Sequence, residues 1–201
     1  VKGMDVIVDG LDQMTPRYIL NRVCQKLRVP YVFAAAIMTY GNMSTIIPGE
    51  TPCLECFQGN LDDDMLPKCA VVGVHPSLLS IIASFEVSEV TRIILREKPL
   101  LANKMLYCDI GNLEFEKIEI SRAENCPVCS PKPSGIPMAL RQRLVMELCG
   151  RRGKRVFVIT PKRNLELNMD ELPSLLVNNG FKIKVKADLG MTFGNGLEET
   201  A

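Results

Sequence analysis

The sequence predicts an α/β protein with a mostly parallel sheet, followed by a smaller α/β appendage. Strand-like and helix-like segments alternate along the first part of the chain in the order of a βαβ unit. Further on, two strand-like segments separated by Gly111 indicate an antiparallel hairpin. Two Cys-x-x-Cys pairs, far apart in the chain, indicate a four-cysteine metal clip that joins distant segments.

The first elements are two strands with a helix between them. A short buried strand is predicted over 4–10, because its apolar run ends in Asp and Gly. A helix is expected over 15–28, where Thr15 stands at a capping position. Pro16 suits the first helical position, since its missing N–H needs no partner there. The apolar run 31–41 predicts a second buried strand, reached by a right-handed crossover.

The segments after this unit complete the predicted sheet. Residues 42–50 indicate a further strand and a turn, and 61–68 form an acidic loop. A long helix with an apolar face is predicted over 75–97. The hairpin follows over 103–110 and 112–121.

A Pro/Ser/Gly-rich linker, residues 131–138, separates a domain of residues 1–130 from an appendage of residues 139–201. The appendage is expected to contain a helix, a strand, a second helix and a second strand, over 139–149, 155–160, 169–180 and 181–187. This order is compatible with a ubiquitin-like or partner-binding module.

Charge and hydropathy exclude two classes of partner. The formal net charge is +1, and no run of 18 apolar residues occurs. We therefore expect a cytoplasmic protein without a signal peptide, which binds neither nucleic acid nor a membrane. The basic run 151–156 is interpreted as a solvated strand flank, with a contact face for an acidic carrier protein as the alternative. The glycine-rich segment 190–196 has no helix after it and is not a phosphate-binding loop.

The chain has eight cysteines, and this number without a signal peptide favours metal or thiol chemistry over disulfides. Cys53 pairs with Cys56, and Cys126 pairs with Cys129. Each pair stands in a proline-bearing turn after a strand, which favours a structural zinc site over a redox pair. Independent buried thiols are a further alternative. Because 69 residues separate the pairs, zinc would clip the hairpin to the end of the βαβ unit.

Four separated motifs resemble those of the ThiF/MoeB/HesA family, the ubiquitin-activating-enzyme-like adenylyltransferases. The segment DVIVDGLDQMTPRYILNRVC resembles the family pattern D-x-x-D-N-x-x-T-R-x-x-x-N, to which this sequence contributes Asp9, Asp12, Thr15, Arg17 and Asn21. Gln13 departs from that pattern, in which Asn is usual. The knuckles TPCLEC and NCPVC, and the stretch PKCAVVGVHPSLLSIIASFEVSEVTRIIL between them, are similar to the family in the same order. The resemblance extends from residue 4 to about residue 130 and implies a partial Rossmann-like fold.

The resemblance implies an enzyme that binds ATP and magnesium and adenylates the C-terminal glycine of a ubiquitin-like or sulfur-carrier protein. Asp12 follows the carboxyl end of a predicted parallel strand, where open α/β sheets bind ligands, and its carboxylate suits magnesium. A turn residue is the alternative for Asp12. Arg17 is expected to anchor Asp12 or a phosphate, with a surface helix residue as the alternative. Family members usually dimerise, so a homodimer is expected.

Cys69 is the candidate nucleophile, because the matching cysteine of the family can form a covalent link with the carrier protein. The adjacent Lys68 and the N-terminus of the following helix would both lower the pKa of its thiol. A small buried thiol is the alternative. His75 is interpreted as a helix cap rather than a partner of Cys69. The isolated cysteines expected in the core are Cys24, Cys108 and Cys149.

Family enzymes begin with a strand and a Gly-x-Gly-x-x-Gly turn that hold the nucleotide, and the sequence from Val1 onward has no counterpart. We therefore expect a piece of a longer enzyme that does not form a complete ATP site alone. A second hypothesis is a non-catalytic, zinc-stabilised subunit that binds a ubiquitin-like partner.

Overall fold

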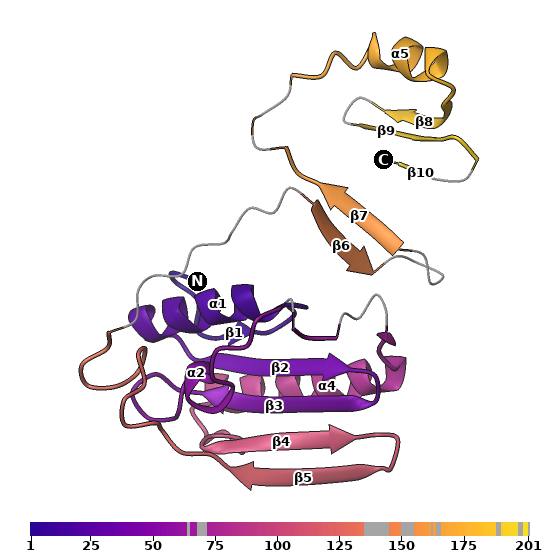
Figure 1. Cartoon of the computed structure of the whole chain (residues 1–201). Coiled ribbons are helices and arrows are strands. Elements are labelled where there is room, and N and C mark those ends of the chain that lie inside the picture. The colour runs from indigo at the N-terminus through magenta and orange to yellow at the C-terminus, as the bar shows by residue number, and fades with distance from the viewer. Residues whose placement is uncertain are drawn as a thin grey trace. The chain divides into compact units, whose positions relative to one another are not determined.

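The computed structural model describes residues 1–63, 65–67, 72–134, 145–149, 155–161, 163, 166–187, 190–196 and 199–200. The chain divides into two compact units, Val1–Val158 and Ile159–Ala201 (Figure 1). The first unit holds a five-stranded sheet and both cysteine pairs, and the second holds a three-stranded sheet. No helix among the described residues is long and apolar enough to cross a membrane.

The five strands lie across the sheet in the order in which they follow along the chain: β1 (Ile7–Val8), β2 (Tyr31–Ile37), β3 (Tyr40–Ile46), β4 (Lys104–Asp109) and β5 (Glu114–Glu119). Helix α1 (Met14–Leu27) connects β1 to β2, which pair in parallel. The predicted βαβ unit is therefore present. The α/β class and the hairpin of β4 and β5 are also confirmed.

The sheet contains fewer parallel pairs than the sequence predicts. After β1 and β2, each neighbouring pair of strands is antiparallel. Only Met38 and Thr39 separate β2 from β3, and so short a connection can join only antiparallel strands, not parallel ones. Met38 adopts the left-handed conformation with φ 53°, which is uncommon for a residue other than glycine. Since methionine is not a typical turn residue, nothing in the sequence indicates that the chain reverses here, and the pattern of 31–41 predicts one strand.

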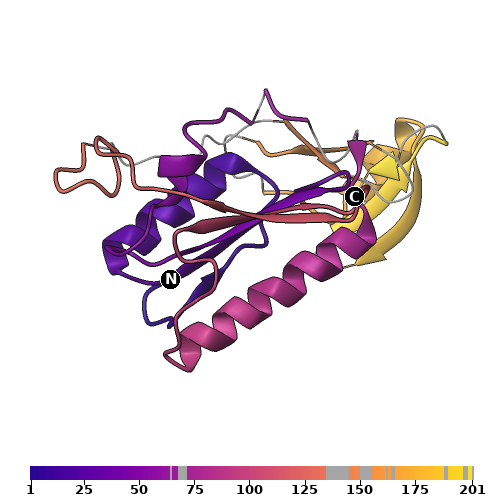
Figure 2. The ribbon, with the colours of Figure 1, turned by 90° about the horizontal axis from the view of Figure 1, so that it is seen from below.

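Two helices cover opposite faces of the sheet (Figure 2). Helix α4 (Pro76–Ile94) packs on β2 and β3 and buries Leu78 and Ile82. At Gly41 of β3, an added Cβ would lie 3.0 Å from Ile82 Cδ1, so glycine lets this helix approach closely. The core cluster around α1 consists of Met14, Tyr18, Cys24, Tyr31, Phe33, Ile46, Cys53, Leu54 and Cys126.

The two helices are capped in different ways. His75 Nδ1 accepts a hydrogen bond from Ser77 N at 3.2 Å, which confirms His75 as the cap of α4. For α1, the sequence prediction of a Thr15 cap is wrong, because the helix begins at Met14. The cap comes instead from the acidic loop: the Asp63 carboxylate accepts from Met14 N at 2.5 Å and Thr15 N at 3.0 Å. A cap supplied by tertiary structure leaves no local sequence signal.

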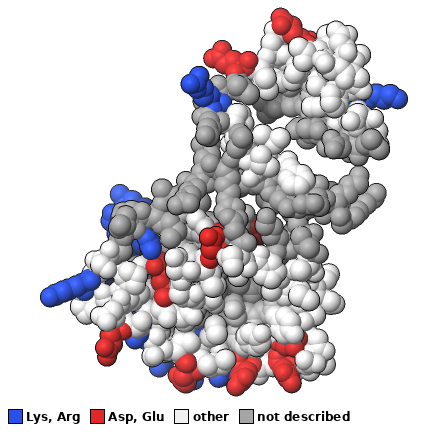
Figure 3. Space-filling model, in the orientation of Figure 1, with Lys and Arg blue, Asp and Glu red and all other residues white. Residues whose placement is uncertain are grey.

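The outer strand β5 is charged. Its six residues are exposed and include Glu114, Glu116, Lys117 and Glu119. Acidic side chains line the corresponding edge in the space-filling view (Figure 3). Charges of this kind discourage an edge strand from pairing with another chain.

Residues 145–149 differ from their prediction. They form strand β6 (Val145–Cys149), which pairs with β7 (Arg155–Ile159), rather than the end of a helix over 139–149. Residues 139–144 lie outside the described residues. In the short run Val-Met-Glu-Leu-Cys, the spacing of the apolar residues does not distinguish a helix from a strand. Pairing with β7 makes the segment a strand. The predicted strand at 155–160 is confirmed.

The second unit contains α5 (Leu172–Asn178), β8 (Lys182–Ala187), β9 (Gly190–Gly194) and β10 (Glu199–Thr200). The predicted helix and strand at α5 and β8 are confirmed. The strands follow the order β10-β9-β8 and are antiparallel. The glycine-rich segment forms strand β9, which agrees with its exclusion as a phosphate-binding loop. Phe181 and Phe193 contact edge to face, with 5.4 Å between ring centroids.

Candidate metal centre and active site

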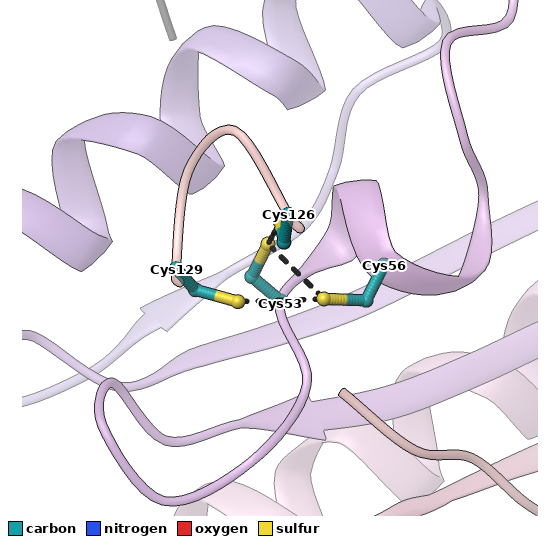
Figure 4. A group of neighbouring side chains, drawn as sticks. All are labelled: Cys53, Cys56, Cys126 and Cys129. Carbon is teal, nitrogen blue, oxygen red and sulfur yellow. Dashed lines mark hydrogen bonds between the residues drawn. The ribbon is translucent and has the colours of Figure 1, made fainter. Parts of the chain in front are cut away.

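The four paired cysteines meet in one cluster. Cys53 stands at the N-terminal end of helix α2 (Leu54–Phe57), which contains Cys56. Cys126 and Cys129 lie in the turn after β5, and Figure 4 shows the four side chains directed toward one another. All four sulfur atoms lie within 4.8 Å of one another. The clustering predicted from the two pairs is confirmed.

The sulfur distances favour one four-ligand site over two redox pairs. The shortest separations join different pairs: Cys56 and Cys129 at 3.3 Å, and Cys53 and Cys126 at 3.6 Å. Within one pair, the sulfurs of Cys53 and Cys56 are 4.0 Å apart. Tetrahedral zinc with Zn–S bonds of about 2.3 Å places its sulfur ligands roughly 3.8 Å apart. The donor set and its spacing therefore fit a metal ion that prefers thiolates.

Burial and the neighbouring sulfurs disfavour the ionisation of two of the four thiols, Cys53 and Cys129. Burial, together with the neighbouring sulfurs, raises the pKa of Cys53. Burial also raises the pKa of Cys129 to about 11. Burial opposes ionisation of Cys126 too, but the backbone N–H groups of Cys129 and Val128, together with the thiols of Cys56 and Cys129, lower that pKa overall. Several buried thiolates at such short range repel one another unless a metal neutralises them.

Two arginines hold the knuckles in place. Arg22 of α1 binds Glu55 of α2 through two parallel hydrogen bonds, Nε to Oε1 at 2.7 Å and Nη2 to Oε2 at 3.0 Å. Arg122, just before the second pair, donates to the carbonyl oxygen of Thr51 at 3.1 Å. These contacts fix both knuckles relative to α1 and to each other.

A second polar group lies at the end of β1, around the buried carboxylate of Asp9. Its Oδ2 accepts from Arg17 Nε at 3.0 Å and from the Tyr31 hydroxyl at 2.5 Å. Its Oδ1 accepts from Leu11 N at 2.9 Å. Burial, and then the charge of Asp9, raise the pKa of Tyr31, so this hydroxyl remains a donor.

Arg17 fastens the loop between β1 and α1 to the sheet. Besides Asp9, its guanidinium donates to the carbonyl oxygens of Leu11 and, at 3.0 Å, Ala34. It also lies over the ring of Phe33, 5.7 Å from the centroid. Arg17 is 7% exposed, so it is not a surface residue. Its hydrogen bonds to oxygen join it to Asp9, Leu11 and Ala34 rather than to Asp12, the partner that the sequence allowed. The sequence assigned no role to Asp9, although the residue stands in the motif.

Asp12 is exposed in the same loop, two residues before α1 begins. This is the carboxyl end of the parallel strand β1, the position expected for a ligand-binding residue. Cys69 and Lys68 lie outside the described residues. Cys24 and Cys108 are buried as predicted, and burial raises the pKa of both thiols, that of Cys24 to about 11. The side chain of Cys149 is outside the described residues.

Sequence reasoning missed Glu86, a buried carboxyl group on α4. It is 7% exposed, and its Oε1 has no hydrogen-bond partner among the described residues. Burial, and then repulsion by Asp9, raise the pKa of Glu86 from 4.5 to about 7, against the opposing effect of Arg17. Its spacing of four from Ile82, and of eight from Leu78, places it on the apolar face of the helix, and this spacing was the available signal.

Glu86 should make the stability of the protein depend on pH. Since the folded-state pKa is raised, the contribution of Glu86 is most favourable below about pH 4.5 and is lost as the pH rises through about 7. Glu86→Gln is neutral throughout, so it should be more stable than the parent at pH 8.5, by up to about 3 kcal/mol, and similar at pH 5. Urea unfolding at both pH values measures the difference.

Glu89, one turn further along α4, provides the matched control. Its carboxylate accepts from the Thr45 hydroxyl at 2.6 Å and from Leu100 N and Leu101 N at 2.9 and 3.0 Å. Glu89→Gln should therefore lower the free energy of unfolding at both pH values. Equal pH dependence in Glu86→Gln and the parent would show that Glu86 does not titrate in this range.

Comparison with known proteins identifies relatives of the first unit. The model of the ThiF family matches residues 1–128. The SAMP-activating enzyme E1 of Haloferax volcanii is 32% identical over 130 residues, which are 64% of this chain and 48% of that protein. Protein HesA of Leptolyngbya boryana is 34% identical over 129 residues, 64% of this chain and 46% of HesA.

A third relative is the adenylyltransferase and sulfurtransferase MOCS3 of Drosophila ananassae, 30% identical over 135 residues, 66% of this chain and 30% of MOCS3. The chain thus spans about half, or less, of the length of these relatives. Among solved structures, Escherichia coli MccB with ATP aligns with a TM-score of 0.55 and 20% identity, over 65% of this chain and 40% of MccB. At this identity, the likeness concerns the fold.

Proposed function

The chain belongs to the ThiF family, and we propose that it is part of an ATP-dependent enzyme that adenylates the C-terminal glycine of a ubiquitin-like or sulfur-carrier protein. The names of two relatives support this reaction class: one is an activating enzyme and another is an adenylyltransferase. Because the relatives extend well beyond the matched part, the activity is proposed for the whole protein.

The observation that carries the proposal is the loop between β1 and α1. Arg17 and Asp9 bond to each other on the buried side of this loop, and Asp12 remains exposed at the carboxyl end of β1. We assign Asp12 as a magnesium ligand, since this metal takes carboxylate and phosphate oxygens. Bound magnesium would offset the charge that develops as pyrophosphate leaves. Arg17 acts as a positioning residue, because its guanidinium is engaged by the protein itself.

Cys69 is proposed as the residue that links covalently to the carrier. Its thiolate would attack the carbonyl carbon of the acyl adenylate, forming a C–S bond. The C–O bond to the phosphate breaks in the same step, and AMP leaves with the electron pair. The four clustered cysteines are proposed to hold a structural zinc ion, which would take no part in this step because its four protein ligands leave no open position.

The exchange of pyrophosphate into ATP tests the proposed activity. The whole protein, mixed with a carrier protein, should catalyse this exchange. In the whole protein, Asp12→Asn should reduce the rate roughly 100-fold, because it removes electrostatic stabilisation of the transition state. Asp5→Asn, which changes an exposed residue before β1, is the control and should leave the rate unchanged. Absence of exchange activity in the whole protein would refute the enzyme assignment.

The alternative is a zinc-stabilised subunit that binds a ubiquitin-like partner without nucleotide chemistry. It is supported by the four clustered cysteines, a donor set that fits a structural metal ion. Under either function we expect a homodimer, which light scattering measures. Carrier binding by the whole protein without pyrophosphate exchange would favour this alternative.

A further inference from the structure

Asn21 connects α1 to the first cysteine knuckle. It lies on α1 and is fully buried, with 0% of its surface exposed. Its Oδ1 accepts a hydrogen bond from the backbone N–H of Leu54 at 3.2 Å. Leu54 is the first residue of α2 and directly follows Cys53, so this bond fixes the backbone beside a metal-ligand position.

The amide nitrogen of Asn21 is a buried donor without an acceptor among the described residues. Nδ2 makes no bond of hydrogen-bonding geometry within the described part of the chain. Such a buried donor costs free energy, because the hydrogen bonds that it made to water in the unfolded chain are not replaced.

The missing acceptor can be supplied by the metal-bound state of Cys53. A neutral thiol is a weak acceptor, whereas a thiolate accepts strongly from an N–H group. Asn21 is placed to supply such an N–H group, because its Oδ1 bonds the backbone N–H of Leu54, the residue next to Cys53.

We propose that Asn21 is a positioning residue of the metal centre, whose Oδ1 holds the backbone at Leu54 and whose Nδ2 donates to the metal-bound sulfur of Cys53. The proposal rests on the assignment of a metal ion to the four cysteines. Residues that hydrogen-bond metal ligands orient them and typically contribute 10- to 100-fold to metal affinity.

The position of Asn21 on α1 gives this contact a wider consequence. Arg17 stands four residues earlier, on the same side of the helix, where it binds Asp9 beneath the loop that carries Asp12. One helix therefore holds the metal centre through Asn21 and the proposed active-site loop through Arg17. Loss of the metal should disturb both.

Titration with Co²⁺, followed by its sulfur-to-metal charge-transfer absorption and by competition with a chelator, tests the proposal. Asn21→Asp has the size of the parent residue and keeps the acceptor for Leu54 N, but it replaces the donor with a carboxylate that repels thiolates. Asn21→Leu removes both functions. We expect Co²⁺ affinity to fall about 10- to 100-fold in both variants and the absorption band to shift.

Asn42→Asp is the matched control, because Asn42 also has a side-chain atom without a partner in the described residues but belongs to strand β3. It should keep the parental affinity and absorption band, even if its melting temperature falls. If Asn21→Leu does not fold, Asn21→Asp decides the test, since it retains the bond to Leu54. Parental affinity and an unshifted band in Asn21→Asp would overturn the proposal. Absence of Co²⁺ binding by the parent would instead overturn the metal assignment on which it rests.

Discussion

Replacement of Cys126 by Ser should abolish stoichiometric metal binding and lower the melting temperature by roughly 10 °C. Three of the four clustered thiols would remain, and the metal link between the two knuckles, which are 69 residues apart in the sequence, would be lost. Because metal-binding free energy contributes to folding where a closed site forms only in the folded state, we expect a loss of at least about 3 kcal/mol. Elemental analysis, with about one zinc per chain in the parent, and calorimetry measure the two effects.

Cys108→Ser provides the control for this substitution. Cys108 is buried on β4 and packs in the core cluster against α4, away from the sulfur cluster. Its replacement should destabilise the protein by a core effect while metal content stays at one per chain. Unchanged metal content and melting temperature in Cys126→Ser would refute the metal centre.

The second large effect is expected at the buried ion pair of Arg17 and Asp9. In Arg17→Met, the Asp9 carboxylate loses its charged partner while it remains buried, with 0% of its side chain exposed. Removing one member of a buried pair costs about 3–5 kcal/mol, because the remaining charge is left uncompensated. Urea unfolding at pH 7 measures this loss in the free energy of unfolding.

Two further variants separate the charge effect from packing. Arg92→Met breaks an exposed ion pair with Glu97, also at 3.0 Å, and should cost less than about 1 kcal/mol. The double variant Asp9→Asn with Arg17→Met leaves no buried charge in this group and should recover part of the loss. If Arg17→Met costs no more than Arg92→Met, the buried pair does not stabilise the loop as described.

Local sequence signals predicted several elements well. The glycine between two strand-like segments located the hairpin of β4 and β5, and His75 was correctly expected to cap α4. Elements whose determinants lie elsewhere in the chain were missed. The start of α1 depends on Asp63, and the turn at Met38 carries no residue that favours it.

The candidate sites divide in the same way. The spacing of the two cysteine pairs was sufficient to predict one four-sulfur cluster, because two Cys-x-x-Cys turns together supply the four thiolates of a tetrahedral metal site. The partner of Arg17 was not predictable, since Asp9 and Asp12 are both within reach of it along the chain. Packing chose between them: Asp9 faces the buried side with Tyr31, and Asp12 faces solvent.

The family, the α/β class and the identity of the four clustered cysteines follow from residue types at short, recognisable spacings. Which charges are buried, and which polar groups bond to one another, depends on the tertiary structure. It paired Arg17 with Asp9, buried Glu86 beneath the sheet and set Asn21 against the first cysteine knuckle. Burial and hydrogen bonding depend on contacts between segments that are distant in the sequence, and local sequence patterns do not show which segments will meet.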